Sequence, residues 1–179
     1  MKDQVREGVL RSFKRLVDED GHLFDCPIEE HSSYDARKLH EVCVNHRLAN
    51  HLEKEIIPVF RLDEAIFVDI EFNREGVDFK NTKINGEDKT VRPDIIIHNR
   101  KTGHEKVNLL VVECKKQGAS EDDIGKDRQK IVALMMDKRY EYSFGLQVVY
   151  GPDGVKGELL FKSETKIVSE AVLVQPPGH

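Results

Sequence analysis

Two stretches of the chain, VRPDIIIHNR (residues 91–100) and NLLVVECKK (residues 108–116), decide the fold. Each holds a run of Ile, Val and Leu that is typical of a buried strand. The segment RKTGHEK between them is polar and centres on Gly103, which predicts a hairpin loop. We therefore expect strands over 94–99 and 107–114 that pair antiparallel, with the numbers of opposed residues summing to about 207.

Each of these apolar strands carries a carboxylate where a buried strand should have none. Side chains alternate between the two faces of a strand, so Glu113 and Lys115 share a face. In the expected register Asp94 lies beside them. Acids at strand ends are also ordinary, and a solvated strand exit is the alternative interpretation of ECKK. A site is favoured because the two acids end adjacent strands and because Lys115 shares the face of Glu113.

The chemistry of two acids and one amine at one sheet edge is specific. Two like charges raise each other's energy unless a cation lies between them. Mg²⁺ takes carboxylate oxygens, keeps several waters and binds phosphate oxygens. A lysine ammonium can hold the attacking water and offset transition-state charge, or the amine can act as a base if its pKa is depressed. Such a set suits the hydrolysis of a phosphodiester.

The remaining segments alternate between helical and strand patterns. Apolar residues at helical spacing predict amphipathic helices at 3–18, 34–57 and 121–138. Ser32 or Ser33 would cap the second helix, and Ser120 would cap the third. Residues 21–33 read as a loop, and Asn85-Gly86 marks a turn within the polar segment 74–90. Further strands are predicted at 65–72, 144–150 and 155–161, whereas 166–174 fits either a strand or a helix.

This order of elements predicts the fold class α/β (α+β mixed), with one central mixed β-sheet flanked by α-helices. We expect a single domain over residues 1–179. Within it, 1–33 would form an N-terminal helix and loop, 34–162 the core that carries the site, and 163–179 a C-terminal element and tail.

The composition narrows the class of protein. The chain is 39% hydrophobic and 34% charged, with no apolar run long enough to cross a membrane, so we expect no membrane partner. Cys26, Cys43 and Cys114 lack metal-ligand spacing and read as reduced thiols, so we expect a cytoplasmic protein. The net charge of −5 counts mildly against nucleic-acid binding, although enzymes that hold metal with carboxylates are a common exception.

Taken with the predicted hairpin and following helix, Asp94 in RPD and Glu113 and Lys115 in ECK resemble the PD-(D/E)XK superfamily of restriction-endonuclease-like nucleases. The resemblance covers roughly residues 35–150. It implies a restriction-endonuclease-like fold in which Asp94 and Glu113 ligate Mg²⁺ (or Mn²⁺) and Lys115 positions or activates the water. It also implies a further acid on the preceding helix, for which Glu41 fits best. The implied reaction is metal-dependent cleavage of phosphodiester bonds in DNA.

Basic residues near the acids in sequence are candidates for binding substrate phosphates. These are Arg92, Lys116, Lys126 and Lys130. The alternative, about equally favoured, is that the helix lysines belong to a solvated face. Lys130 follows Asp127 by three residues, so these two also fit a surface ion pair.

The aromatic content of the chain bears on which nucleic acid it would bind. Only 7% of residues are aromatic, and no stacking strip for single-stranded bases is present, so duplex DNA is preferred while RNA is not excluded. We expect a nuclease of this size that cuts both strands of DNA to form a homodimer. The alternative function is a non-catalytic module on the same fold that binds nucleic acid or another protein, and the acidic charge balance motivates it.

Overall fold

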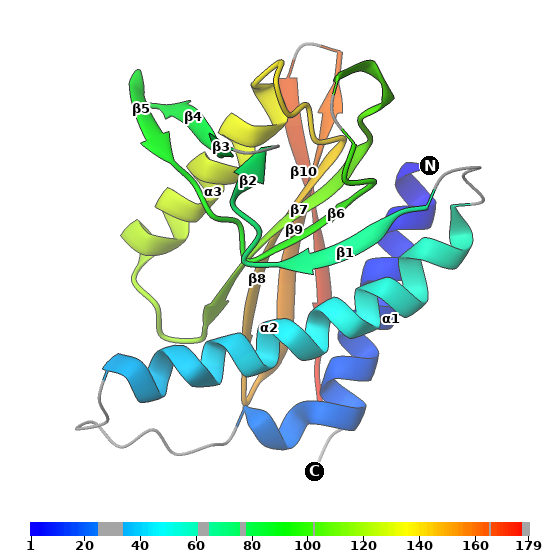
Figure 1. The fold of residues 1–179 in the computed structure, drawn as a ribbon. Helices are drawn as coiled ribbons and strands as arrows, with labels where there is room; N and C mark the ends of the chain where they lie inside the picture. The colour runs from blue at the N-terminus through cyan, green and yellow to red at the C-terminus, as the bar shows by residue number, and fades with distance from the viewer. Residues whose placement is uncertain (25–33, 61–64, 76–77, 102, 165, 177–179) are drawn as a thin grey trace.

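The computed structural model describes residues 1–24, 34–60, 65–75, 78–101, 103–164 and 166–176. A six-stranded sheet runs through its centre in the order β1-β6-β7-β8-β9-β10 (Figure 1). β7 and β8 are parallel, and the other neighbours in this sheet are antiparallel. Its strands are β1 (Phe67–Ile70), β6 (Ile95–His98), β7 (Asn108–Lys116), β8 (Phe144–Gly151), β9 (Gly154–Ser163) and β10 (Lys166–Val174).

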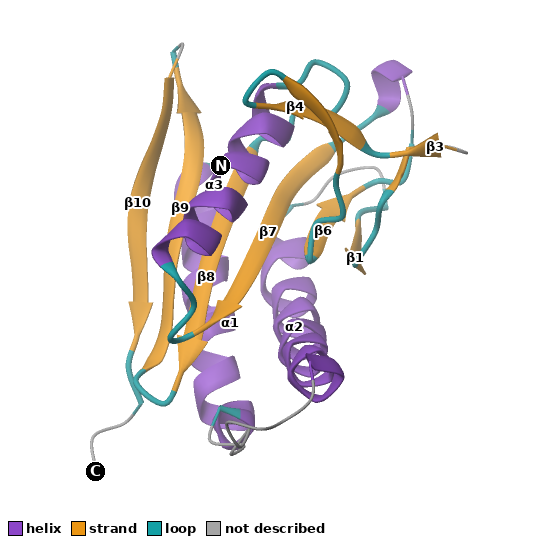
Figure 2. Cartoon of the chain, turned by 90° about the vertical axis from the view of Figure 1, so that its left-hand side faces the viewer, coloured by secondary structure: helices purple, strands orange, loops and turns teal. Residues whose placement is uncertain are grey.

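Helices cover both faces of this sheet. α1 (Lys2–Asp20) and α2 (Tyr34–Ile56) lie on one face, and α3 (Glu121–Met136) crosses the other (Figures 1 and 2). Each face has its own apolar core: Leu16, Leu48 and Leu110 are fully buried on the first, and Ile96 and Leu134 on the second. The predicted central mixed sheet flanked by helices is therefore confirmed.

The β6–β7 hairpin has the predicted register. Ile95 opposes Val112 and Ile97 opposes Leu110, so the paired numbers sum to 207. The register then shifts by one between Ile97 and His98, next to the loop. In the loop, Gly103 has a φ of +68°, a conformation that glycine adopts without strain.

The three predicted helices are present, two of them start at the predicted residue, and the other ends differ by one or two residues. The side chain of Ser120 accepts a hydrogen bond from the main-chain N–H of Asp123, so the predicted cap of α3 is confirmed. The predicted caps of α2, Ser32 and Ser33, lie outside the described residues, as does most of the predicted loop 21–33. Within the described ranges, no helix is both long enough and apolar enough to cross a membrane.

The polar segment 74–90 holds more structure than its sequence indicates. β2 (Arg74–Glu75) pairs with β3 (Asp78–Phe79), and β4 (Asn81–Ile84) pairs with β5 (Glu87–Thr90). The predicted turn at Asn85-Gly86 joins β4 to β5, and both residues have positive φ, as a two-residue hairpin turn requires. The strands were missed because β5 is exposed throughout and lacks the apolar alternation of a half-buried strand. At the C-terminal end, residues 166–174 form the strand β10 rather than a helix.

Candidate functional site

Asp94 stands immediately before β6, beside the end of β7. Its Oδ2 accepts a hydrogen bond of 2.7 Å from the main-chain N–H of Cys114. This bond holds the Asp94 carboxylate between Glu113 and Lys115 along the neighbouring strand. Cys114 itself is buried and packs in the core on the α1 and α2 side, as expected for the strand residue between them. The hairpin therefore brings Asp94 to Glu113 and Lys115, as the register predicts.

Glu113 is the most deeply buried acid of the site, with 1% of its surface exposed. Its Oε2 lies 2.6 Å from Nζ of Lys130 on α3, and the two groups are hydrogen-bonded. Its Oε1 is also buried and receives no hydrogen bond from the described residues. A buried carboxylate oxygen without a donor costs free energy, so one coordination position at Glu113 is left open to a proton or a cation.

Asp127 on α3 joins the two lysines. Its side chain is 9% exposed, with Oδ2 2.9 Å from Nζ of Lys115 and Oδ1 3.5 Å from Nζ of Lys130. A continuous chain of opposite charges thus runs from Lys115 through Asp127 and Lys130 to Glu113. Together with Asp94 these residues form what we call the acid–lysine cluster: Asp94, Glu113, Lys115, Asp127 and Lys130.

α3 reaches the cluster because it packs closely on β8 at a glycine. An added Cβ at Gly145 would lie 2.1 Å from Cγ2 of Ile131, so the helix packs directly on the strand backbone. Nearby, Nε2 of Gln147 donates a 2.6 Å hydrogen bond to the main-chain oxygen of Ile124. At 100° per residue, Asp127 and Lys130 lie about 60° apart, on either side of the fully buried Leu134. The face that packs on the sheet therefore also carries the charged groups into the site.

Burial and mutual repulsion shape the titration of the two acids. Burial, followed by the nearby charge of Asp94, raises the pKa of Glu113 well above its usual value. Burial also raises the pKa of Asp94, against the opposing effect of the Cys114 N–H and the two lysines. Ionising one of these carboxyl groups thus makes ionisation of the other less favourable. A metal ion between them would remove this repulsion.

The lysines of the cluster are held as cations. Burial alone would lower the pKa of Lys115, but the ion pair with Asp127 outweighs it and raises that pKa to about 12. Burial would also lower the pKa of Lys130, but the charge of Glu113 and the hydrogen bond to it, together with the charges of Asp127 and Asp94, outweigh burial and raise this pKa. Both amines are therefore protonated at neutral pH, which favours the electrostatic role of Lys115 over the role of a base.

Glu41, the expected acid on α2, lies at the same end of the sheet as Asp94, because both charges act on Tyr150. Its charge and that of Asp94 both add to the effect of burial in raising the pKa of Tyr150, whose buried hydroxyl accepts no partner among the described residues. Among those residues, Glu41 does not complete a group of three metal-ligating side chains with Asp94 and Glu113 in this structure.

The four expected phosphate-binding residues divide between the site and the surface. Lys130 lies in the acid–lysine cluster. Lys116 is half-buried at the end of β7, and Arg92 is exposed with its guanidinium 3.6 Å from Glu71. Lys126 is 64% exposed and pairs with Asp122 one turn away, as in the solvated-face interpretation.

The cluster was then compared with the needs of a metal ion. Among the described residues, no group of three or more His, Cys, Asp or Glu side chains is arranged to hold one. Asp94 and Glu113 nevertheless supply the hard oxygen donors that Mg²⁺ prefers, and Oε1 of Glu113 has no other partner. The donor set fits a site with two protein carboxylates in which water and substrate complete the shell.

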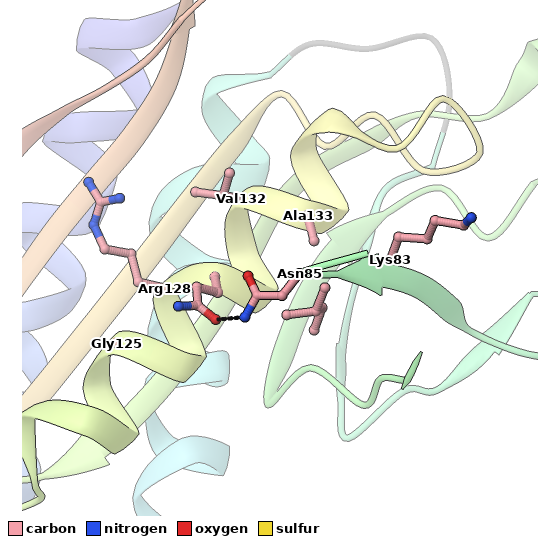
Figure 3. Close-up of a pocket in the computed structure, with 8 residues that line it drawn as sticks. Lys83, Asn85, Gly125, Arg128, Val132 and Ala133 are labelled. Carbon is pink, nitrogen blue, oxygen red and sulfur yellow. Dashed lines mark hydrogen bonds between the residues drawn. The ribbon is translucent and has the colours of Figure 1, made fainter. Parts of the chain in front are cut away.

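A separate hollow lies on the other side of α3 (Figure 3). It is an open pocket of about 510 Å³ between α3 and the β4–β5 hairpin, and Asn85 bridges it with a hydrogen bond to Gln129. The helix residues that line it point away from Asp127 and Lys130. This pocket is therefore distinct from the acid–lysine cluster.

The chain was compared with models of protein families, with curated proteins and with solved structures, and none of the three comparisons returned a match.

Asp127 is the site residue that sequence reasoning missed. The sequence pairs Asp127 with Lys130, three residues on, only as a surface ion pair. The signal was its position on the helix face of Ile131 and Leu134, which are fully buried. An acid on the buried face of an amphipathic helix needs a buried cation, and Lys115 on the strand beneath supplies it.

Proposed function

We propose that this chain is a metal-dependent nuclease of the PD-(D/E)XK type that hydrolyses phosphodiester bonds in DNA. The observation that carries the proposal is the meeting of Asp94, Glu113 and Lys115 at one end of the β6–β7 hairpin. The buried Oε1 of Glu113 without a donor adds weight, because it is available to a cation.

In this proposal Asp94 and Glu113 hold Mg²⁺ or Mn²⁺. The metal, when bound, supplies Lewis-acid polarisation of a phosphoryl oxygen and a more acidic bound water. Lys115 offers a permanent positive charge toward the reacting phosphate or the attacking water, since Asp127 holds its ammonium in the charged form. Lys130 offers a second positive charge beside Glu113, where a phosphate oxygen can accept a hydrogen bond from it.

The experiment measures cleavage of plasmid, linear and single-stranded DNA with Mg²⁺ and with Mn²⁺. Asp94→Asn, Glu113→Gln and Lys115→Gln should each lower the cleavage rate by roughly 10²–10³-fold, the range seen when one preorganised charge-stabilising group is removed. The matched control is Lys54→Gln, which removes an exposed lysine of α2 outside the cluster and should leave the rate unchanged.

A second readout is independent of turnover. Titration of the purified protein with Mn²⁺ by calorimetry should give a saturable site that Asp94→Asn weakens and Lys54→Gln does not. RNA of the same length serves as a competing substrate. Metal-independent traces of cleavage that are equal in wild type and all variants would mark a contaminant and overturn the assignment.

One observation favours the second candidate, a non-catalytic module on the same fold. Lys130 already neutralises Glu113, so the acid–lysine cluster also makes sense as an internal ion-pair network that only stabilises the fold. Absence of both cleavage and Mn²⁺ binding, with DNA binding that survives Glu113→Gln, would support this function. Absence of any nucleic-acid binding would instead support a protein-interaction role.

A further inference from the structure

The two edges of the central sheet differ. On one side the sheet ends with β1, which has four residues, and on the other it ends with β10, which has nine. Figure 2 shows β10 at the outer margin with no further described element beyond it. Natural proteins blunt exposed edges with short strands, prolines, bulges or inward charges, because an open edge pairs with other strands. β10 contains no proline, and its pairing with β9 continues without interruption.

The open main-chain groups of β10 can be assigned from its pairing. Ser163 opposes Lys166 across a two-residue connection, so this pair exchanges its main-chain hydrogen bonds. The turn that pairs Gly151 with Gly154 gives the same result for β9: its even-numbered residues bond to β8, and its odd-numbered residues bond to β10. Even-numbered residues of β10 therefore bond to β9, and odd-numbered ones direct their N–H and C=O groups outward. These outward residues are Ile167, Ser169, Ala171 and Leu173.

We propose that β10 pairs antiparallel with β10 of a second copy of this chain, with the two-fold axis at Glu170. In this pair the odd-numbered residues of one strand must lie opposite odd-numbered residues of the other, because only these direct their main-chain groups outward. The two-fold axis therefore relates one residue to the same residue of the second copy, and does not fall between two consecutive residues. Centring it on Glu170 overlaps all nine residues of both strands. Ile167 then opposes Leu173 of the second copy and Ser169 opposes Ala171, so every outward group is paired.

The side chains suit this register. Ile167 would contact Leu173 of the second copy, and Leu173 is 49% exposed in the single chain. Val168 would lie opposite Val172. Aliphatic side chains thus meet aliphatic side chains on both faces of the sheet.

The charges at the axis are balanced. Two glutamates directly opposite each other would repel. Each Glu170 is accompanied by cations from α1, however, with Nζ of Lys2 at 2.6 Å and Nε of Arg6 at 3.7 Å. Asp3 also lies 4.0 Å from Nζ of Lys2, so two copies bring four cations and four carboxylates near the axis, and each Glu170 faces complementary charges.

The test begins with the mass of the full chain by sedimentation equilibrium, which should show a dimer. Ala171→Pro removes an outward N–H and leaves the hydrogen bonds to β9 intact. It should weaken dimerisation by roughly 30-fold or more, because two main-chain hydrogen bonds are lost per dimer and the ring obstructs the edge. Ala171→Val, which keeps the N–H, is the matched control and should remain dimeric.

The register is tested by cross-linking, with Cys26 and Cys43 replaced by Ser. Glu170→Cys places two thiols across the axis at a non-hydrogen-bonded pair, where the Cα separation of about 4.5 Å suits a disulfide. Ser169→Cys faces residue 171 instead and should not cross-link to itself. If the Pro variant fails to fold, as judged by circular dichroism, this pair of cysteine variants decides.

A chain that stays monomeric up to about 100 μM, far above the Kd of specific interfaces, would overturn the proposal and leave the edge to a strand from another protein. So would a dimer that survives Ala171→Pro, or cross-linking by Ser169→Cys but not by Glu170→Cys. This inference does not depend on the nuclease proposal, since none of these readouts involves DNA or metal.

Discussion

Replacement of Gly145 by Ala should separate α3 from the sheet. Gly145 lies in β8 directly beneath the helix, and a Cβ there would be 2.1 Å from Cγ2 of Ile131 and 2.9 Å from Sδ of Met135. Real Cβ atoms essentially never come within 3.0 Å of another heavy atom. Both neighbours are fully buried, so neither can turn toward solvent. The added methyl group therefore forces either the helix or the strand to move.

We expect Gly145→Ala to lower the free energy of unfolding by about 3 kcal/mol, the upper part of the usual cost of overpacking a core. For a chain of this size that corresponds to a fall in Tm of roughly 6–12 °C. Urea denaturation followed by circular dichroism measures the free energy. Because α3 carries Asp127 and Lys130, the acid–lysine cluster should loosen at the same time, and Mn²⁺ binding should weaken.

The matched control is Gly125→Ala on α3 itself. A Cβ at Gly125 meets no atom within 4 Å, and alanine has the higher helix propensity, so this variant should gain about 0.5–1 kcal/mol. The double variant Ile131→Ala/Gly145→Ala should cost about 1 kcal/mol less than the sum of its single changes, since the clashing methyl is gone. A loss below about 0.5 kcal/mol for Gly145→Ala, or perfect additivity, would refute the packing described for this helix.

Two further predictions concern buried ion pairs. Burial alone would raise the pKa of Asp20, but hydrogen bonds from His51 and Arg47 outweigh it and lower the pKa of the folded protein. Asp20 therefore stabilises the fold at pH values above its unfolded pKa of about 3.9, and this stabilisation is lost as the pH falls through the lower folded pKa. Asp20→Asn should therefore cost about 2 kcal/mol at pH 7 and progressively less as the pH falls below about 3.9, measured by urea denaturation at a series of pH values; a cost that does not change with pH would contradict the assignment. Asp127→Asn should lower the rate of DNA cleavage by about 10–100-fold and leave the Mn²⁺ affinity within a few-fold of wild type. The reason is that this change frees the Lys115 ammonium without removing a metal ligand. An unchanged cleavage rate would show that Lys115 needs no positioning.

The part of the site that was predictable is the part that depends on local pairing. The loop around Gly103 is short, the strands beside it are apolar, and side chains alternate strictly along them. These facts are enough to place Asp94 beside Glu113, and the observed register agrees. A one-residue slip would have moved Glu113 to the opposite face, so the burial of the aliphatic residues also determines the position of the acids.

The parts that were not predictable depend on packing between distant segments. The position of Asp127 follows from how far α3 rotates and how closely it approaches β8, and Gly145, eighteen residues further along the chain, allows that approach. The path of α2 across the sheet is a second example. It brings the charge of Glu41 close enough to Tyr150 to raise the pKa of that hydroxyl, and no local pattern of the sequence encodes the separation of these two residues. The role of Glu41 as a metal ligand stays a prediction.

The role of Lys115 shows how the tertiary contact changes the chemistry. From sequence alone, a lysine on a partly buried strand has two roles open to it, a charged donor or a neutral base with a depressed pKa. The choice between them depends on the nearest anion, and Asp127 lies at 2.9 Å. With that anion in place the amine stays protonated, so any activation of water must come from another group.

The acid–lysine cluster holds three carboxyl groups and two ammonium groups. Burial is the main cause of the raised pKa values of Asp94 and Glu113, the charge of a neighbouring acid adds to it, and the charges of the lysines oppose it only in part. The two lysines therefore do not fully neutralise Asp94. A proton can do so at low pH, but a divalent ion can do so at neutral pH and can bind phosphate as well. Removing one charge should therefore reduce the need for the ion: Asp94→Asn should stabilise the metal-free fold while weakening Mn²⁺ binding, a combination that a purely structural ion-pair network would not show.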